Sequence, residues 1–239
     1  MLGPRCRPVD GRGGSGGDAV PDVFLVRHGE AESNAMGYIS STVPGPPLTA
    51  LGRRQAERAA DLLARRLRGR PVRIVSSPMR RALETALATA VRFGAEVAVV
   101  DGLREVALGT WEGRPWRDLL AQDPSFAAWR NDPEGQRPPG GESASEVEAR
   151  VRAALTASAR SLPDGVALVA FSHQDAIGAM LAPLRGIAWS DAHGQRPELL
   201  NGVVVHLRHE RPDGPWRFVS LDPSAARVDA ADARAGGGT

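Results

Sequence analysis

Short apolar runs recur along the chain, and two of them end in a histidine. The runs and the residues that follow are 23–26 with Arg27 and His28, and 166–171 with Ser172 and His173. Unbroken apolar runs of this length are typical of strands buried on both faces, as in a parallel sheet. In open α/β folds ligands bind at the carboxyl ends of such strands. The pattern therefore predicts a binding site around the two histidines.

Helical periodicity and capping signals fill the stretches between the apolar runs. Further strands are predicted at 72–75, 96–100, 203–207 and 216–221, the last two as a possible pair. One helix begins after Thr49 as N-cap, and a second has Ser77 as N-cap and Pro78 as its first residue. Ser143 and Glu146 form a capping box that opens a third helix, and a fourth starts near Asp175. Alternating strands and helices predict an α/β fold with three layers, in which a mostly parallel sheet carries helices on both faces.

The pattern also divides the chain into segments. Residues 1–20, rich in Gly, Arg and Pro, are expected to be a disordered leader, and 223–239 a flexible tail. One domain spans 21–222. Within it, 114–142 is a less regular insertion, interpreted as a variable lid, whose aromatic residues can form an apolar lid or simply pack; packing is favoured. These aromatic residues are Trp116, Phe126 and Trp129.

Composition narrows the classes of function. The 239 residues are 42% hydrophobic, and the chain contains neither a secretory signal nor an apolar run long enough for a membrane span, which favours a cytoplasmic protein without a membrane partner. The single cysteine excludes an internal disulfide framework. Every basic residue is arginine, yet the net charge is only +2 and aromatic residues are sparse, so nucleic-acid binding is not expected. The oligomeric state cannot be read from the sequence.

The polar residues at the predicted sheet edge suit a phosphoryl group. Arginine forks bind phosphate oxygens through charge-assisted hydrogen bonds, and Arg81 stands at the start of a predicted helix. A neutral imidazole is a competent nucleophile near pH 7. A carboxylic acid such as Glu105 can protonate a leaving oxygen. Glu112 lies close by in the sequence and is an alternative carboxylic acid.

Several blocks, taken in order, resemble the histidine phosphatase (phosphoglycerate mutase-like) superfamily over about residues 22–208. The blocks are Arg27-His28-Gly29-Glu30, Asn34, Pro47-Leu48-Thr49 with Gly52 and Gln55-Ala56, Ser76-Ser77-Pro78-Met79 with Arg81-Ala82 and Thr85-Ala86, Leu103 with Glu105, Gly109 with Trp111-Glu112-Gly113, Gly140-Gly141-Glu142-Ser143, and Ser172-His173. Two features depart from the family pattern. Gln174 stands where glycine is common after the second histidine, and the loop over 40–46 contains no glutamine.

The resemblance implies a mechanism and the residues that perform it. His28 would attack phosphorus and become phosphohistidine, while Arg27, Arg81 and His173 hold the phosphoryl oxygens. Asn34 would add a hydrogen bond, unless it only shapes its loop. Glu105 would protonate the leaving alkoxide and then activate water. Neither a metal nor a cofactor is implied, because arginines supply the positive charge.

The resemblance leaves more than one function open. A phosphomonoesterase acting on a small phosphorylated metabolite is preferred. A phosphoglycerate mutase is the alternative, although the Phe-Thr-Gly-Trp loop and the longer block after the acid that mark such mutases are missing. A catalytically silent binding member is a third possibility, but silent members usually lose a core residue and this chain keeps them all. Protein-phosphotyrosine hydrolysis finds no support in any added interaction domain.

Overall fold

A single mixed sheet forms the centre of the molecule. The computed structural model describes residues 21–189, 199–209 and 214–227. Their strands follow the order β3-β2-β4-β1-β5-β6. The bounds are β1 Asp22–Arg27, β2 Val72–Ser76, β3 Val97–Val99, β4 Ala167–Ser172, β5 Val204–His209 and β6 Trp216–Asp222. The first four strands are parallel, whereas β5 pairs antiparallel with β1 and β6 pairs antiparallel with β5. The mostly parallel sheet predicted from sequence is confirmed.

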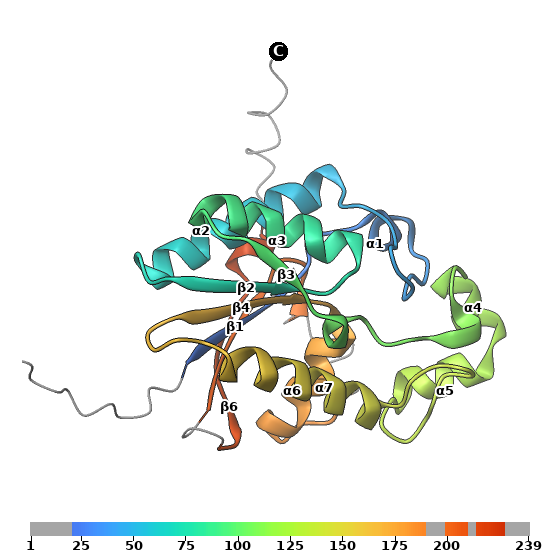
Figure 1. The fold of residues 1–239 in the computed structure, drawn as a ribbon. Coiled ribbons are helices and arrows are strands. Elements are labelled where there is room, and N and C mark those ends of the chain that lie inside the picture. The colour runs from blue at the N-terminus through green and yellow to red at the C-terminus, as the bar shows by residue number, and fades with distance from the viewer. Residues whose placement is uncertain (1–20, 190–198, 210–213, 228–239) are drawn as a thin grey trace, which may run out of the picture.

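Helices cover both faces of the sheet. Their bounds are α1 Glu32–Met36, α2 Ala50–Leu67, α3 Arg80–Phe93, α4 Trp116–Gln122, α5 Pro124–Asn131, α6 Ala144–Arg160 and α7 Gln174–Arg185. Figure 1 shows α2 and α3 above the sheet and α6 and α7 below it. Alternate residues of β1 enter two separate cores, with Phe24 on the α2–α3 side and Leu25 on the α6–α7 side. The apolar run over 23–26 is unbroken because both faces of its strand are buried.

Two of the three predicted helix caps are present. Thr49 Oγ1 accepts a hydrogen bond from the Gly52 N–H at 3.0 Å, and Ser143 and Glu146 form the reciprocal capping box. The prediction for Ser77 was wrong. Helix α3, the one assigned to this cap, begins at Arg80 with Met79 as its N-cap. Ser77 Oγ accepts from the Met79 N–H at 3.3 Å, before the helix starts. The Ser77 hydroxyl also contacts His173, a pairing between distant parts of the chain that local capping rules cannot reveal.

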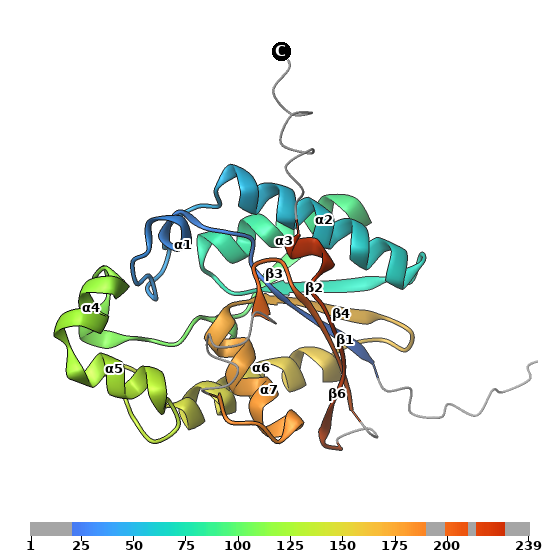
Figure 2. The same cartoon turned by 180° about the vertical axis from the view of Figure 1, so that it is seen from behind.

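The insertion over 114–142 carries the short helices α4 and α5. Both views show them beyond one end of the sheet, on the same side as α1 (Figures 1 and 2). Phe126 and Trp129 are 1% and 2% exposed and pack against Trp111, as the packing interpretation expects. Trp116 is 39% exposed and is free to contribute to a binding surface. The described part of the chain contains no helix of the length and apolarity that membrane crossing requires.

The two predicted terminal segments are described only in small part. The leader over 1–20 lies outside the described residues, as does the tail after residue 227. The first residues of the predicted tail form the 3-10 turn η4 (Ser224–Ala226), in which Ala225 is buried in the core beside α2. The folded chain therefore continues a few residues past the predicted boundary at 222.

Two glycines allow the loop after β1 to pack against the start of α2. A Cβ on Gly52 would lie 2.0 Å from the Glu30 carbonyl oxygen, and one on Gly29 would lie 2.2 Å from the Gly52 carbonyl oxygen. The obstructing atoms are backbone, which cannot turn aside as a side chain can. The glycine that follows His28 is therefore required by close backbone packing.

We expect Gly52→Ala to lower the free energy of unfolding by about 3 kcal/mol, because its Cβ overpacks this contact. Thermal denaturation should show a fall in Tm of roughly 2–4 °C for each kcal/mol in a chain of this size. Gly69→Ala is the control. Gly69 has a φ of +81° and an added Cβ would meet nothing within 4 Å, so only backbone strain of about 1–2 kcal/mol is expected. A Gly52→Ala protein as stable as Gly69→Ala would contradict the packing argument.

Candidate active site

Three parallel strands bring the candidate residues to one edge of the sheet. In the pairing of β1 with β4, Arg27 lies opposite Ser172, so His28 and His173 follow side by side. The His28 N–H donates to the Ser172 carbonyl at 3.1 Å, and the Ser77 N–H donates to the Phe171 carbonyl at 3.0 Å. The carboxyl ends of β1, β4 and β2 therefore meet. The two predicted histidines come together, with ring centroids 5.0 Å apart.

His28 is held in one tautomer. Its Nδ1 lies 2.6 Å from the Gly29 carbonyl oxygen, which can only accept, so Nδ1 carries the proton. Its Nε2 accepts from the Nε–H of Arg81 at 3.0 Å. Burial, together with the positive charges of Arg81 and Arg27, places the pKa of His28 well below its usual value. The imidazole is therefore neutral at pH 7, and the lone pair on Nε2 faces the arginine that would bind phosphate.

His173 is also neutral and fully buried, and its ring is oriented by Ser77. Burial is the main cause that lowers the pKa of His173 far below its usual value. Ser77 Oγ accepts from the Met79 N–H, so its own proton is available to donate to His173 Nε2, 2.8 Å away. With Ser77 as the donor in this bond, the single ring proton of His173 lies on Nδ1. That nitrogen has no hydrogen-bond partner among the described residues.

The two predicted phosphate arginines are positioned by backbone carbonyls. Arg27 Nη1 donates to the Leu199 carbonyl, and Arg81 Nη2 donates to the Ser40 carbonyl at 3.0 Å. Burial lowers the pKa of both guanidinium groups, that of Arg27 to about 10, so both stay charged at pH 7. Arg27 Nε and Arg81 Nη1 are buried and have no hydrogen-bond partner in the described part of the chain.

Three buried donors without acceptors therefore belong to the side chains next to His28. They are Arg27 Nε, Arg81 Nη1 and His173 Nδ1. Buried polar groups are nearly always hydrogen-bonded, and an unsatisfied one costs about 1–3 kcal/mol. A tetrahedral oxyanion offers several acceptor oxygens to a cluster of this kind. The arrangement fits a phosphoryl group next to His28 Nε2.

The carboxylate of Glu105, a residue of the loop before η2 (Gly109–Trp111), lies at the N-terminal end of α7. Its carboxylate accepts from the N–H groups of Val106 at 2.9 Å and Ala176 at 3.1 Å. Burial and the like charge of Asp175 raise the pKa of Glu105 to about 7, against the opposing effect of Arg81. A carboxyl group with this pKa can donate a proton and take one back near neutral pH.

These side chains surround a cavity of about 370 Å³, a size typical of small-molecule sites, which span ~300–1,000 Å³. Of the predicted site residues, Arg27, His28, Asn34, Arg81 and Glu105 line it. His173 is not among the lining residues, but its ring packs edge-on against that of His28. Within the described ranges, no three His, Cys, Asp or Glu side chains are grouped as metal ligands.

Comparison with known proteins assigns the family. A family profile described as histidine phosphatase superfamily (branch 1) matches residues 23–221. The chain belongs to this superfamily. A probable phosphoglycerate mutase of Yersinia enterocolitica is 37% identical over 199 residues, which cover 81% of this chain and 86% of the relative.

Solved structures of other proteins share the histidine phosphatase fold. The structure called mycobacterial hydrolase 1 is 30% identical with a TM-score of 0.72, and the match covers 84% of this chain and 97% of the other. A mycobacterial glucosyl-3-phosphoglycerate phosphatase, solved with VO3, is also 30% identical with a TM-score of 0.69, covering 83% and 97%. The resemblance and the fold class inferred from sequence are confirmed, whereas the roles of individual residues stay predictions.

The structure separates the two carboxylic acids that the sequence left open. Glu112 does not line the cavity. Its carboxylate accepts from the backbone and side chain of Ser41, at 2.7 and 2.6 Å, and from Thr42. Glu112 thus fixes the loop that supplies the Ser40 carbonyl to Arg81. Glu105 is the carboxyl group that faces the cavity.

Asn34 lies on the cavity wall, but part of its hydrogen-bonding capacity is used. Its Oδ1 accepts from the Ala31 N–H at 3.0 Å and from Asn201 Nδ2 at 3.4 Å. The Asn34 NH₂ group is the part left for a ligand. Asn34 lies in α1 rather than in a loop, so it caps the start of that helix and can also contact a phosphate. Gln174, the departure from the family pattern, lines the same cavity.

Sequence reasoning missed several residues of this site. Asp175 acts electrostatically on Glu105, and Asn201 Nδ2 donates to the His28 carbonyl at 3.1 Å. Arg130 lines the cavity from α5. Asp175 lies two residues after His173, so its position alone was a usable signal. Asn201 and Arg130 lie in segments without a recognisable motif, and only the fold brings them to the site.

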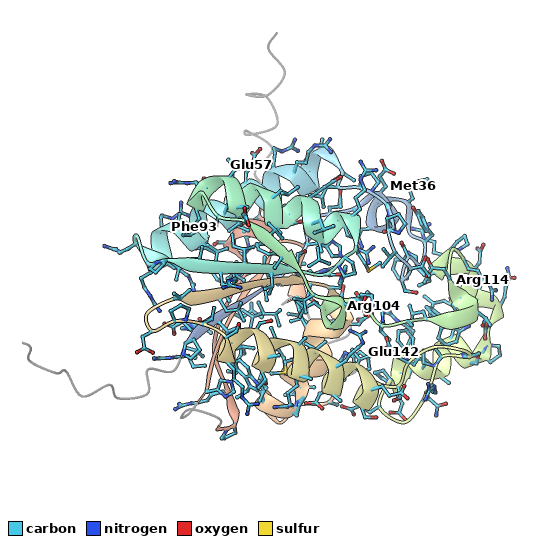
Figure 3. The ribbon with its side chains drawn as sticks, viewed as in Figure 1. Met36, Glu57, Phe93, Arg104, Arg114 and Glu142 are labelled. Carbon is cyan, nitrogen blue, oxygen red and sulfur yellow. The ribbon has the colours of Figure 1, made fainter. Side chains whose placement is uncertain are left out.

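The loop that carries Glu105 is fixed by an ion pair between Glu142 and Arg150. Arg150 Nε and Nη2 donate to the Glu142 carboxylate at 2.7 and 2.8 Å. The same guanidinium donates to the carbonyls of Gly102, Arg104 and Glu105, at 3.0, 2.8 and 2.9 Å. Figure 3 shows Arg104 and Glu142 between the sheet and the α4–α5 segment. Arg150 of α6 thus connects Glu142 to the backbone of the loop.

We expect Arg150→Met to cost about 3 kcal/mol of stability, because it leaves the Glu142 carboxylate and three carbonyls without their donor. It should also lower the rate for alkyl phosphates more than for aryl phosphates, because a loosened Glu105 protonates poor leaving groups badly. Denaturant unfolding and the two rates measure these effects. Arg152→Met on the same helix is the control, since the surface pair of Arg152 with Glu148 is worth under about 1 kcal/mol. Equal effects of the two substitutions would contradict the role of Arg150.

Proposed function

We propose that the protein is a phosphomonoesterase that hydrolyses a small phosphorylated metabolite through a phosphohistidine on His28. The observation that carries this proposal is that the three side chains next to His28, those of Arg27, Arg81 and His173, each have a buried N–H donor without an acceptor. Such a group matches the oxygens of a phosphoryl group and the charge that builds on them during transfer.

The first step is attack on phosphorus. When a phosphoryl oxygen accepts from Arg81, the lone pair of His28 Nε2 is released from its hydrogen bond with that side chain. Nε2 then forms a bond to phosphorus while the bond from phosphorus to the ester oxygen breaks. The proton stays on Nδ1 and is donated in a hydrogen bond to the Gly29 carbonyl, which stabilises the positive charge that the imidazole gains. Glu105 in its acid form gives its proton to the departing alkoxide.

The second step returns the enzyme to its starting state. Glu105, now a carboxylate, takes a proton from a water molecule, whose oxygen attacks phosphorus. The bond between phosphorus and Nε2 breaks, and inorganic phosphate leaves. The pKa of about 7 suits Glu105 to both directions of proton transfer. Arg27 and Arg81 supply the positive charge in this scheme, so it requires neither a metal nor a cofactor.

A mutase is the second candidate, because a relative that is 37% identical is named a probable phosphoglycerate mutase. The two functions differ in the acceptor of the phosphoryl group. The test uses purified protein, a generic aryl phosphate and EDTA, with and without an added phosphoglycerate as acceptor. A phosphatase releases inorganic phosphate in equal amounts in both mixtures. Transfer to the phosphoglycerate would favour the mutase, loss of activity in EDTA would exclude the metal-independent scheme, and inactivity towards all esters would favour a silent binding protein.

A further inference from the structure

Arg130 places a positive charge on the cavity wall away from His28. It belongs to α5 and lines the same cavity as His28, Arg81 and Glu105. Its guanidinium carbon lies 5.9 Å from the centre of the Trp116 ring, a cation–π distance. The positive charges that act on the His28 imidazole are those of Arg81 and Arg27. His28 follows β1 at the end of the sheet, whereas α5 lies beyond that end (Figures 1 and 2), so Arg130 reaches the cavity from the insertion and not from the sheet that carries His28.

No carboxylate neutralises Arg130 among the residues that the structure describes. Two neighbouring arginines of the insertion do have ion pairs. Arg114 binds Asp123, and Arg137 binds Glu146. The two acidic residues in the cavity wall are Glu105 and Asp175, and neither forms a salt bridge with Arg130. A half-buried guanidinium that is stacked on an aromatic ring and faces a cavity is suited to an anionic ligand.

Apolar side chains line the same cavity as Arg130 and the two phosphate arginines. Trp116 offers a ring face at the cavity wall, and Ile39 and Leu108 add apolar surface. A carbon chain or ring can cross this stretch. The guanidinium fork then meets whatever group lies at the far end of the alcohol portion. Because it presents paired N–H donors, a carboxylate or a phosphoryl group fits it better than a neutral hydroxyl.

On the basis of the proposed function, we infer that the substrate is a phosphomonoester whose alcohol portion carries a second anionic group, which Arg130 binds. The shared chemistry is a planar or tetrahedral oxyanion, either a carboxylate or a second phosphoryl group. Arg130 is then a specificity-determining residue. Trp116 holds the Arg130 side chain against the cavity wall.

The test measures binding of phosphonates, because their carbon–phosphorus bond is not hydrolysed and turnover does not matter. The probes are ω-phosphonocarboxylates with two to four carbons, the matching neutral amides, and the matching bisphosphonates, titrated calorimetrically. We expect the acid or the bisphosphonate to bind at least about tenfold more tightly than the amide at the best chain length. The stronger of the two anionic probes identifies the second group as carboxylate or phosphoryl.

Substitutions at Arg130 and at a control arginine show whether this preference depends on Arg130. Arg130→Gln should reduce the preference to within about twofold, and Arg130→Lys should keep part of it. Arg117→Gln is the control, because Arg117 is exposed on α4 and does not line the cavity. It should leave the preference unchanged. An equal loss in Arg117→Gln would show a long-range charge effect and overturn the inference.

Other outcomes separate this inference from the proposed function. If the wild-type protein prefers no anionic probe at any length, or if Arg130→Gln keeps the full preference, the inference is wrong even though aryl phosphates are hydrolysed. If the preference depends on Arg130 while no ester is hydrolysed in EDTA, the anion subsite stands and the hydrolytic function fails.

Discussion

His28→Ala should reduce phosphate release from an aryl phosphate by about 10⁴-fold or more, because it removes the nitrogen that forms the covalent intermediate. The same substitution should abolish the acid-labile, base-stable phosphoryl adduct that rapid quenching with labelled ester would trap on the wild-type enzyme. Assays contain EDTA so that a contaminating metal-dependent phosphatase does not contribute.

The matched control for this substitution is His206→Ala. His206 lies in β5, where its Nε2 contacts Asp22 and its ring stacks on Phe24, away from the cavity. We expect His206→Ala to keep its activity and to form the adduct. Normal turnover by His28→Ala would exclude the phosphohistidine mechanism, and equal loss in both variants would indicate damage to the fold instead.

Glu105→Gln should lower kcat/KM for alkyl phosphates by about 10²–10⁴-fold, the range of general acid catalysis. Esters of p-nitrophenol should lose less, because their leaving group departs without a proton. The amide also cannot take a proton from water, so the phosphoryl adduct should accumulate during turnover of the aryl ester. Steady-state rates with both esters and quenched-flow measurements test these expectations.

The pH dependence of the same reaction follows from the raised pKa of Glu105. Burial and the charge of Asp175 bring this pKa to about 7, and the free enzyme must hold the proton to act as an acid. The kcat/KM for alkyl phosphates should therefore fall as pH rises through about 7. In Glu105→Gln this decline should vanish, and in Asp175→Asn it should move to lower pH because the like charge is gone.

Glu112→Gln is the control for the choice of acid, since Glu112 does not line the cavity and its carboxylate binds the loop at Ser41 and Thr42. It should leave the ratio of alkyl to aryl rates as it is in the wild-type enzyme. A Glu105→Gln enzyme that loses both rates equally, or that keeps the decline near pH 7, would contradict the assignment of Glu105 as the proton donor.

The features that could be read from sequence are those with a local signature. The apolar runs at 23–26 and 166–171 predicted the buried strands, and the polar residues after them predicted the sheet edge. Thr49 and Ser143 correctly predicted the starts of their helices, because a cap side chain bonds to the N–H only three residues further along the chain. The resemblance added Arg81 and Glu105, which spacing alone left among several candidates.

What the sequence could not supply depends on contacts between distant segments. No local sequence pattern indicates that β4 lies between β1 and β2, or that β5 runs antiparallel beside β1. The acceptors that fix Arg27 and Arg81 are backbone carbonyls, which every residue has and no residue type identifies. Ser77 was assigned to a cap because its bond to His173 spans 96 residues of chain.

The position of β1 in the sheet has a consequence for how the protein is made. Among the described residues β1 is the first strand to be synthesised, and there it pairs only with β4 and β5, which come much later in the chain. About 140 residues must be translated after β1 before β4 exists, which takes roughly 10–30 s at ~5–20 residues per second. During that interval the nascent chain carries an apolar segment, residues 23–26, with no strand to pair with. We expect ribosome-bound fragments that end before β4 to bind hold-type chaperones through this segment and to aggregate without them.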